Sequence, residues 1–161
     1  MRKKSVGIFM LVIIIGVAGY VLFPHISDMG ESSKKRNLIR SAKVYGDEVK
    51  NLWNTDALVC EHGSGFKSLI GIPDDDYYVM LGKNNTQNGI PSVNLDKIDG
   101  KYYGYVHIVL KQRIPSYSVI LTDGTYTIKS DKNYSAVTIK DVEEGKMDFT
   151  FDSNYHYCKA D

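Results

Sequence analysis

The sequence has few cysteines, few prolines and no excess of charge of either sign. Two cysteines, four prolines and one tryptophan occur among 161 residues, and 20 lysines and arginines stand against 19 aspartates and glutamates. The formal net charge is therefore +1, which excludes the strongly basic field that nucleic-acid-binding domains use. We expect no nucleic-acid partner.

Motifs that carry catalysis, phosphate binding or metal binding are also missing. The sequence has no Cys-x-x-Cys or His-x-x-His pair, no nucleophile motif in a strand-turn-helix context and no phosphate-binding glycine loop. Asp74-Asp75-Asp76 lacks the spacing of a calcium loop, so we interpret it as a solvated turn. His62 and His156 each stand two residues from a cysteine, and a metal or acid-base role for this pair is the alternative to simple proximity. The sequence predicts a protein that is not an enzyme and needs no cofactor or metal.

One long apolar run stands near the N-terminus. Residues 5–23 carry no charge, follow Met1-Arg2-Lys3-Lys4 and precede Pro24. At about 1.5 Å rise per residue, a helix of this length crosses most of a hydrocarbon core of roughly 30 Å. We predict a transmembrane helix at 5–23 behind a basic segment at 1–4, with the membrane as a partner. A signal peptide cleaved after Val17-Ala18-Gly19 is the alternative, although the run continues beyond that site to Phe23.

The cysteines and the charges that flank the span bear on its orientation. Cys60 and Cys158 are predicted to form one disulfide, because disulfides persist in exported domains, and two buried thiols are the alternative. Basic residues lie on both sides of the span, since more lysines and arginines follow between Lys34 and Arg40, so the positive-inside rule alone does not fix the orientation. The disulfide favours a single-pass protein with a cytoplasmic N-terminus and an extracytoplasmic head domain.

Residues 24–60 have the pattern of an amphipathic helix that continues the predicted span. Apolar side chains recur at steps of three and four, which places them in one stripe: Leu38, Ala42, Tyr45, Val49 and Leu52. Ser32 or Ser33 can cap the start of the amphipathic part, and Asn54-Thr55-Asp56 is its expected end. The stripe needs a covering surface, which we expect the rest of the chain to supply.

From residue 61 onward, short runs separated by turn residues predict a β-rich head domain at 61–161. Tyr102–Lys111 is the strongest strand, with His107 as an outward or half-buried partner of tyrosines. Asp123-Gly124 predicts a hairpin with a type I′ turn, and a loop with one helical turn near Phe66–Ile70 is expected before the first strand. The other predicted strands are Tyr77–Leu81, Ser116–Thr122, Thr125–Ser130, Tyr134–Ile139 and Met147–Phe151. We expect an α+β fold in which an antiparallel meander of roughly four to six strands lies on the helix.

The segment Ile14–Pro24 resembles the apolar helix of type IV pilins and pseudopilins, in which a glycine stands eight positions before a proline. Gly16 and Pro24 keep that spacing, and Gly19 lies on the same helix face as Gly16. The similarity extends to an amphipathic second half of the helix, an antiparallel sheet and a cysteine pair that closes the carboxyl-terminal region. It implies a pilin-like fold with a long N-terminal helix, half in the membrane and half amphipathic. It also implies helix packing between subunits through Gly16, Gly19 and Pro24.

The prepilin signature of that family is incomplete in this chain. The family has a glutamate at the fifth mature position, whereas here the position falls on Gly7, or on Val12 if Gly7 precedes the cleavage point. In the family, a subunit that begins a filament can lack this glutamate. The resemblance therefore implies a minor or tip subunit more readily than an abundant shaft subunit.

Two functions are consistent with these expectations. The first is a structural subunit of a type IV pilus or secretion pseudopilus, assembled with identical or different pilin-like subunits through the apolar helix into a cell-surface filament. The second is a singly anchored or secreted extracellular binding domain that does not polymerise. Its tyrosine-rich sheet or loops would recognise a polymer or a protein, since the chain contains 12 tyrosines.

Overall fold

The computed structural model describes residues 30–62, 66–67, 73–82, 92–93, 101–134, 137–147 and 155–160. The predicted segments 1–4 and 5–23, and with them Gly16, Gly19 and Pro24, lie outside these residues. The chain divides into two compact units, Met1–Lys34 and Lys35–Asp161, and every described strand belongs to the second unit. Within the described ranges, no helix is both long enough and apolar enough to cross a membrane.

The helix is described over residues 30–54 and buries the predicted stripe. Leu38, Ala42, Tyr45 and Val49 are all at most 2% exposed, and Leu52 packs partly buried against the same core. The helix ends in a Schellman motif, because Asp56 has a left-handed φ of 55° and the Ala57 amide donates to the carbonyl oxygen of Leu52 at 2.9 Å. Residues 58–60, the last of the predicted helical segment 24–60, belong to a strand, because the strand Leu58–His62 begins there.

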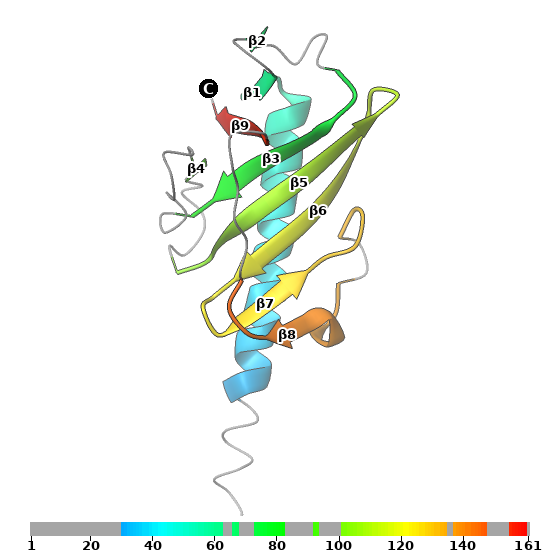
Figure 1. Cartoon of the computed structure of the whole chain (residues 1–161). Coiled ribbons are helices and arrows are strands. Elements are labelled where there is room, and N and C mark those ends of the chain that lie inside the picture. The colour runs from blue at the N-terminus through cyan, green and yellow to red at the C-terminus, as the bar shows by residue number, and fades with distance from the viewer. Residues whose placement is uncertain are drawn as a thin grey trace, which may run out of the picture. The chain divides into compact units, whose positions relative to one another are not determined.

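Nine strands form one connected sheet in the described part of the chain (Figure 1). The order is β2-β1-β9-β3-β5-β6-β7-β8, and β4 also pairs with β3. A 3-10 helix, η3, spans Ile139–Asp141. The strands are β1 Leu58–His62, β2 Phe66–Lys67, β3 Asp76–Leu81, β4 Ser92–Val93, β5 Tyr103–Lys111, β6 Ile114–Thr122, β7 Tyr126–Lys129, β8 Val142–Glu144 and β9 His156–Ala160.

The sheet is mixed, which corrects the predicted antiparallel meander. Strands β5 to β8 are consecutive and antiparallel, as expected for a meander. The C-terminal strand β9, however, lies between β1 and β3 and runs parallel to β3, and β4 is also parallel to β3. The α+β class is confirmed, whereas the topology contains parallel pairs that local turn patterns do not encode.

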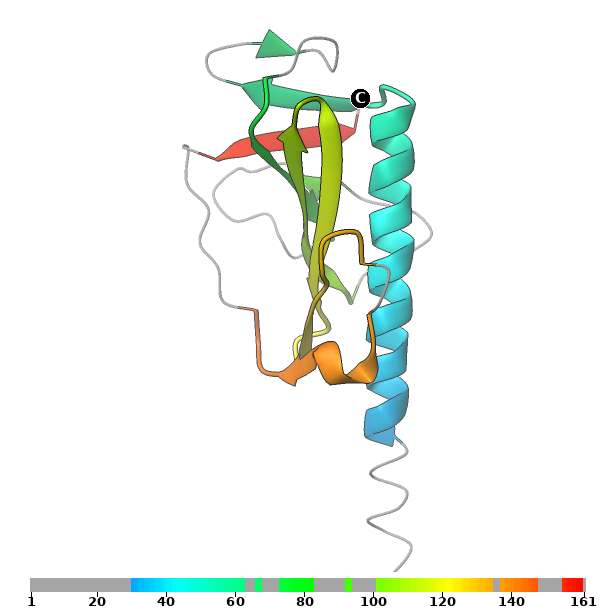
Figure 2. The same ribbon diagram turned by 90° about the vertical axis from the view of Figure 1, so that its right-hand side faces the viewer.

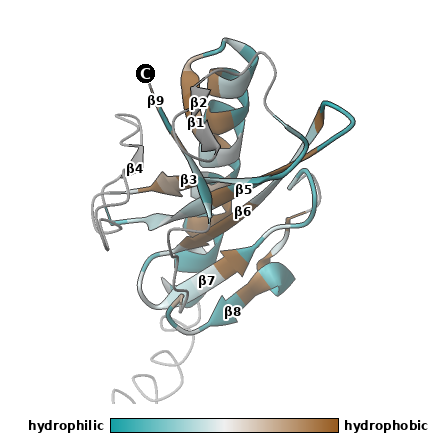
Figure 3. Cartoon of the chain, turned by 45° about the horizontal axis from the view of Figure 1, so that its top comes forward, coloured by the Kyte–Doolittle hydropathy of each residue, from teal (hydrophilic) through white to brown (hydrophobic). Residues whose placement is uncertain are grey.

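The helix covers one face of the sheet (Figure 2). Successive strand residues point to opposite faces, so alternate residues of each strand face the helix. Val79 of β3, Val106 of β5 and Val119 of β6 lie opposite one another in register and are fully buried. Apolar residues mark β3, β6, β7 and turns of the helix in Figure 3. These inward strand residues and the apolar stripe of the helix together form the hydrophobic core, so the sheet supplies the covering surface that the stripe needs.

Most predicted strands are confirmed, but two predictions fail for local reasons. Tyr134–Ile139 is not a strand in its described residues, because Tyr134 has a positive φ of 44° and Ile139 begins η3. The expected helical turn near Phe66 is wrong for Phe66–Lys67, which form β2. Met147–Phe151 lies outside the described residues beyond Met147.

The type I′ turn predicted at Asp123-Gly124 is found instead at the β5–β6 hairpin, for which no turn type was predicted. At Asp123-Gly124 the hairpin between β6 and β7 is confirmed, but only Gly124 has a positive φ, of 89°, so the predicted type I′ turn is wrong there. At the tip of the β5–β6 hairpin, Gln112 and Arg113 have φ values of 51° and 63°. Left-handed conformation at both central residues is what a type I′ turn requires.

The predicted disulfide is present. Cys60 of β1 and Cys158 of β9 are bonded and lie directly opposite one another in the antiparallel pair. Both residues are at most 1% exposed. The bond joins the strand that comes after the helix to the last strand of the chain.

Candidate functional site

The sheet face turned away from the helix, here called the outer face, carries aromatic and polar side chains. In β5 the buried inward residues alternate with half-buried outward ones, Tyr103, Tyr105, His107 and Val109. The strand register places Tyr78 of β3 opposite His107. The predicted role of His107 as a half-buried partner of tyrosines is confirmed.

Four rings of the outer face form one group, here called the aromatic cluster: Tyr78, Tyr105, His107 and Tyr155. Tyr78 lies at its centre and stacks on His107 with 4.6 Å between ring centroids and 3° between planes. The rings of Tyr105 and Tyr155 meet Tyr78 at centroid distances of 5.8 and 5.2 Å in edge-to-face geometry. Tyr155, just before β9, is 40% exposed. Each such ring pair stabilises by about 0.5–1.5 kcal/mol beyond its buried area.

The pKa values of two tyrosine hydroxyls of the cluster, Tyr78 and Tyr105, are raised, so these two hydroxyls stay protonated at neutral pH. Burial raises the pKa of Tyr105 to about 12, and the neighbouring Tyr78 and Tyr155 add to the increase. Burial, and next the charge of Asp76, also raises the pKa of Tyr78. The cluster therefore offers neutral donors and ring edges, which suit a partner recognised by contact and hydrogen bonding.

Two histidines pair with successive aspartates at the start of β3. The Nε2 atom of His156 lies 3.1 Å from Oδ2 of Asp75, and Nε2 of His107 lies 3.4 Å from Oδ2 of Asp76. His156 packs on the ring of Tyr77, at 5.7 Å between centroids, whereas His107 stacks on the outward Tyr78, so the two pairs do not converge. In the described ranges, no three His, Cys, Asp or Glu side chains are grouped to hold a metal ion.

The predicted relation between His62 and His156 is not tested, because the side chain of His62 lies outside the described residues. Asp74 and Asp76 are exposed, as a solvated turn requires, but Asp76 already belongs to β3. Ser118 lies opposite His107 in the β5–β6 register. Nε2 of His107 lies at ion-pair distance from Asp76, and no hydrogen bond with favourable geometry is formed at this atom in the described part of the chain.

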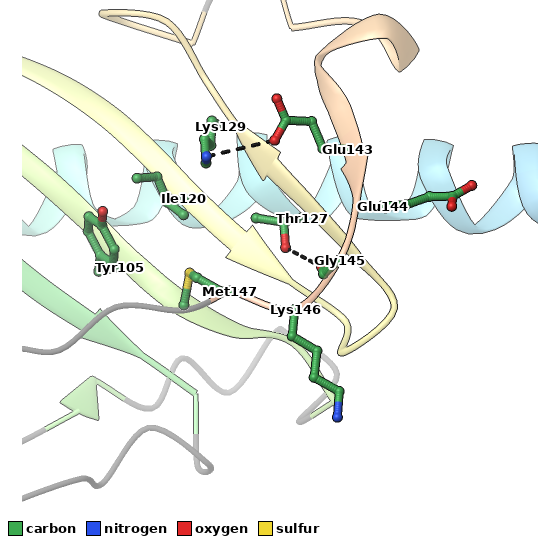
Figure 4. A pocket seen from close by; sticks show the side chains of 9 residues that line it. All are labelled: Tyr105, Ile120, Thr127, Lys129, Glu143, Glu144, Gly145, Lys146 and Met147. Atoms are coloured by element: carbon green, nitrogen blue, oxygen red, sulfur yellow. Dashed lines mark hydrogen bonds and ion pairs between the residues drawn. The ribbon is translucent and has the colours of Figure 1, made fainter.

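A shallow pocket of about 240 Å³ adjoins the aromatic cluster through Tyr105 (Figure 4). Tyr105, Ile120 and Met147 supply its apolar surface, and an ion pair between Lys129 and Glu143, at 3.7 Å, stands at its edge. The other lining residues are Thr127, Glu144, Gly145 and Lys146. The Thr127 hydroxyl donates to the carbonyl oxygen of Gly145 at 2.7 Å, which ties the segment after β8 to β7. The pocket has room for a single side chain or ring.

Comparison of the chain with protein-family models, with curated proteins and with solved structures found no match to any of them. The candidate sites are therefore inferred from the sequence and from the geometry of the described residues alone.

Of the predicted site residues, the structure brings together Cys60 and Cys158. Gly16, Gly19 and Pro24 lie outside the described residues, so their role in helix packing stays a prediction. The sequence did not predict the pocket or the histidine–aspartate pairs, because they join segments distant in sequence. The alternation of Tyr103, Tyr105 and His107 was the one local signal for the aromatic cluster.

Proposed function

We propose that this chain is a pilin-like, membrane-anchored extracytoplasmic protein that serves as a structural subunit, of the minor or tip type, in a type IV pilus or secretion pseudopilus. The single observation that carries the proposal is the helix with one face fully buried under a β-sheet head. This arrangement supports the resemblance of the Gly16–Pro24 segment to a pilin stem.

The disulfide and the position of β9 support the same proposal. Cys158 closes the chain onto Cys60, so the last strand is held beside the strand that leaves the helix. A domain closed by a disulfide is typical of proteins in an oxidising compartment outside the cytoplasm. In this proposal the N-terminus stays cytoplasmic, and the apolar segment 5–23 binds first lipid and then the apolar helices of other subunits, with Gly16 and Gly19 allowing close approach.

A charged residue at position 16 tests the proposal. Gly16→Lys places a charge on the helix face predicted to contact other subunits, so we expect it to abolish incorporation into filaments sheared from the cell surface. Gly30→Lys is the matched control, because a side chain at Gly30 meets nothing within 4 Å. Equal incorporation of both variants, or no filament with the unmodified chain, would contradict the assembly role.

A second function, an anchored or secreted binding domain that does not polymerise, is favoured by the aromatic cluster. Tyr155 is exposed on the outer face and Tyr105 joins the cluster to the pocket. Exposed tyrosines supply large contact area at low entropic cost in recognition surfaces. If the unmodified chain stays monomeric in detergent and in the membrane, and Tyr155→Ala weakens binding of cells to a surface or polymer, this function replaces the first.

A further inference from the structure

The exposed side of the helix carries a second stripe, here called the charged stripe. Its members recur at steps of four, three, four and three: Arg36, Arg40, Lys43, Asp47 and Lys50. The apolar stripe, which starts at Leu38, repeats at the same steps two residues later, and two residues turn an α-helix by about 200°. The charged stripe therefore lies on the side of the helix opposite the sheet, and all five of its residues are exposed.

The charged stripe is mainly cationic. Four of its five residues are lysine or arginine, and none of these four forms an ion pair within the described part of the chain. Asp47 is the one carboxylate of the stripe, and it already accepts a hydrogen bond from the hydroxyl of Tyr134. The other carboxylates of the described helix, Glu31 and Glu48, are half-buried and lie out of phase with the stripe. A partner that approaches this side of the helix meets four cations and one carboxylate.

A lysine on another side of the same helix shows the contrast. The Lys35 ammonium lies over the ring of Tyr126 in β7, at 5.0 Å from the ring centroid, so this cation contacts the sheet layer. The cations of the charged stripe lie on the opposite side, where a partner can approach them without displacing the sheet. A stripe of one dominant charge is suited to a partner of the opposite charge.

The charged stripe follows closely on the predicted transmembrane segment, since residues 24–35 separate Phe23 from Arg36. A straight helix would place Arg36 about 20 Å and Lys50 about 40 Å beyond Phe23. The headgroup layer on each side of a bilayer is only about 5–7 Å thick, and charges are screened within about 8 Å at physiological salt. The stripe therefore meets headgroups along its length only when the helix is inclined toward the bilayer. Pro24 stands between the two segments in the sequence, and proline is a residue that permits such a bend.

We propose that the charged stripe binds the anionic lipid headgroups of the bilayer that anchors segment 5–23, and so holds the subunit against the membrane before it enters a filament. Clustered lysines and arginines next to a membrane anchor are attracted by anionic lipid, and the anchor raises the local concentration of headgroups. The contact also gives a reason for the basic residues beyond the span, which the positive-inside rule does not explain. This inference rests on the proposed function and deepens it, because it names what the unassembled subunit binds.

Energy transfer from the full-length chain to labelled lipid tests this contact. A coumarin amino acid replaces Val44, which is 39% exposed and follows directly on Lys43, and the bilayer of a nanodisc carries a rhodamine-headgroup lipid as acceptor. We expect transfer to be at least about twofold higher in discs with roughly a third phosphatidylglycerol than in phosphatidylcholine discs. At about 0.5 M salt the difference should vanish, because the screening length falls to about 4 Å. The same donor at Tyr155, on the outer face of the sheet, should show no increase.

A charge variant and a matched control provide the second measurement. The stripe variant should lose the increase in transfer at Val44, because it removes three cations from the exposed side of the helix while glutamine keeps a similar helix propensity. The control removes three exposed cations elsewhere, so it has the same net charge and should keep the increase. The stripe variant is Arg36→Gln, Arg40→Gln and Lys43→Gln, and the control is Lys111→Gln, Arg113→Gln and Lys132→Gln.

The outcomes separate this contact from the pilus role. Equal transfer from Val44 in the two kinds of disc, an equal loss in both triple variants, or an increase at Tyr155 as large as at Val44 overturns the headgroup contact. Insertion into the discs without the increase leaves the proposed pilus role standing. Failure of the unmodified chain to insert into either disc overturns the predicted anchor and the headgroup contact together.

Discussion

The hydroxyl of Tyr134 donates a hydrogen bond to the carboxylate of Asp47 across the interface between the helix and the sheet layer, at 3.1 Å. The ring of Tyr134 lies directly above Gly46, because a Cβ at Gly46 would come within 2.7 Å of it. A backbone with φ of 44° places this ring against the helix. This contact fixes the segment after β7 on the helix.

Removing the Tyr134 hydroxyl destabilises the protein, whereas removing a comparable one does not. Tyr134→Phe deletes a charge-assisted hydrogen bond, so the free energy of unfolding falls by about 1–2 kcal/mol. Tyr117→Phe is the matched control, since the Tyr117 hydroxyl is buried with no hydrogen-bond partner in the described ranges. Its removal is neutral or stabilising. Urea unfolding of the full-length chain in detergent measures both, and equal losses would contradict the account.

A methyl group at Gly104 disrupts the centre of the sheet. A Cβ there would lie 2.0 Å from the backbone carbonyl oxygen of Ile120 on the neighbouring strand, which cannot move without breaking the ladder. Gly104→Ala therefore costs at least about 3 kcal/mol. Gly30→Ala, where nothing lies within 4 Å, is neutral or stabilising by up to about 1 kcal/mol. The midpoint of thermal unfolding should fall for Gly104→Ala and stay the same or rise for Gly30→Ala, and equal midpoints for the two variants would contradict the account.

The Asp74 carboxylate stabilises the left-handed turn at Gln112-Arg113. Asp74→Ala removes the acceptor of two exposed amides, which water then solvates, so the free energy of unfolding falls by about 0.5–1.5 kcal/mol. Arg113→Gly stabilises by about 1 kcal/mol, because glycine adopts a φ of 63° without strain. Combined with Asp74→Ala, it recovers part of the loss. Additive destabilisation by both changes in urea titrations would show that the turn is not strained.

Alkaline pH lowers stability through buried tyrosines. Burial raises the pKa of Tyr117 to about 12, and burial, then the charges of Asp75 and Asp74, raises that of Tyr77 to about 12, against an ordinary value of 10.0. A raised pKa means that the folded state favours the protonated hydroxyl, so this stability is fully present below pH 10. It is lost as the pH rises from about 10 through about 12. The ultraviolet absorbance of tyrosinate, recorded with far-ultraviolet circular dichroism, should show ionisation and unfolding together, and ionisation of all tyrosines near pH 10 in the folded protein would contradict this.

Local patterns were sufficient for the helix and for the two long strands β5 and β6, and the presence of only two cysteines was sufficient for the disulfide. The stripe from Leu38 to Val49 repeats at the helical period, and the alternation from Tyr103 to Leu110 repeats at the strand period. Each period predicts which side chains of its element face the core and are buried. The strand β9 escaped prediction because it is short and its neighbours, β1 and β3, lie far away in the sequence. The aromatic cluster was only partly foreseen, since Tyr155 joins Tyr78 only through that placement of β9.

By itself, the sequence determined the class of the fold, the buried face of the helix and the pairing of Cys60 with Cys158, because periodicity and a single cysteine pair leave few alternatives. Only the tertiary structure decided the parallel placement of β9, the pairing of Asp75 with His156 and of Asp76 with His107, and the pocket beside Tyr105. These depend on which distant segments share a sheet edge or face. The type I′ turn is one example, since the Asp74 carboxylate, remote in sequence, accepts hydrogen bonds from the amides of the left-handed turn at Gln112-Arg113, whereas local preference predicted this turn type at Asp123-Gly124.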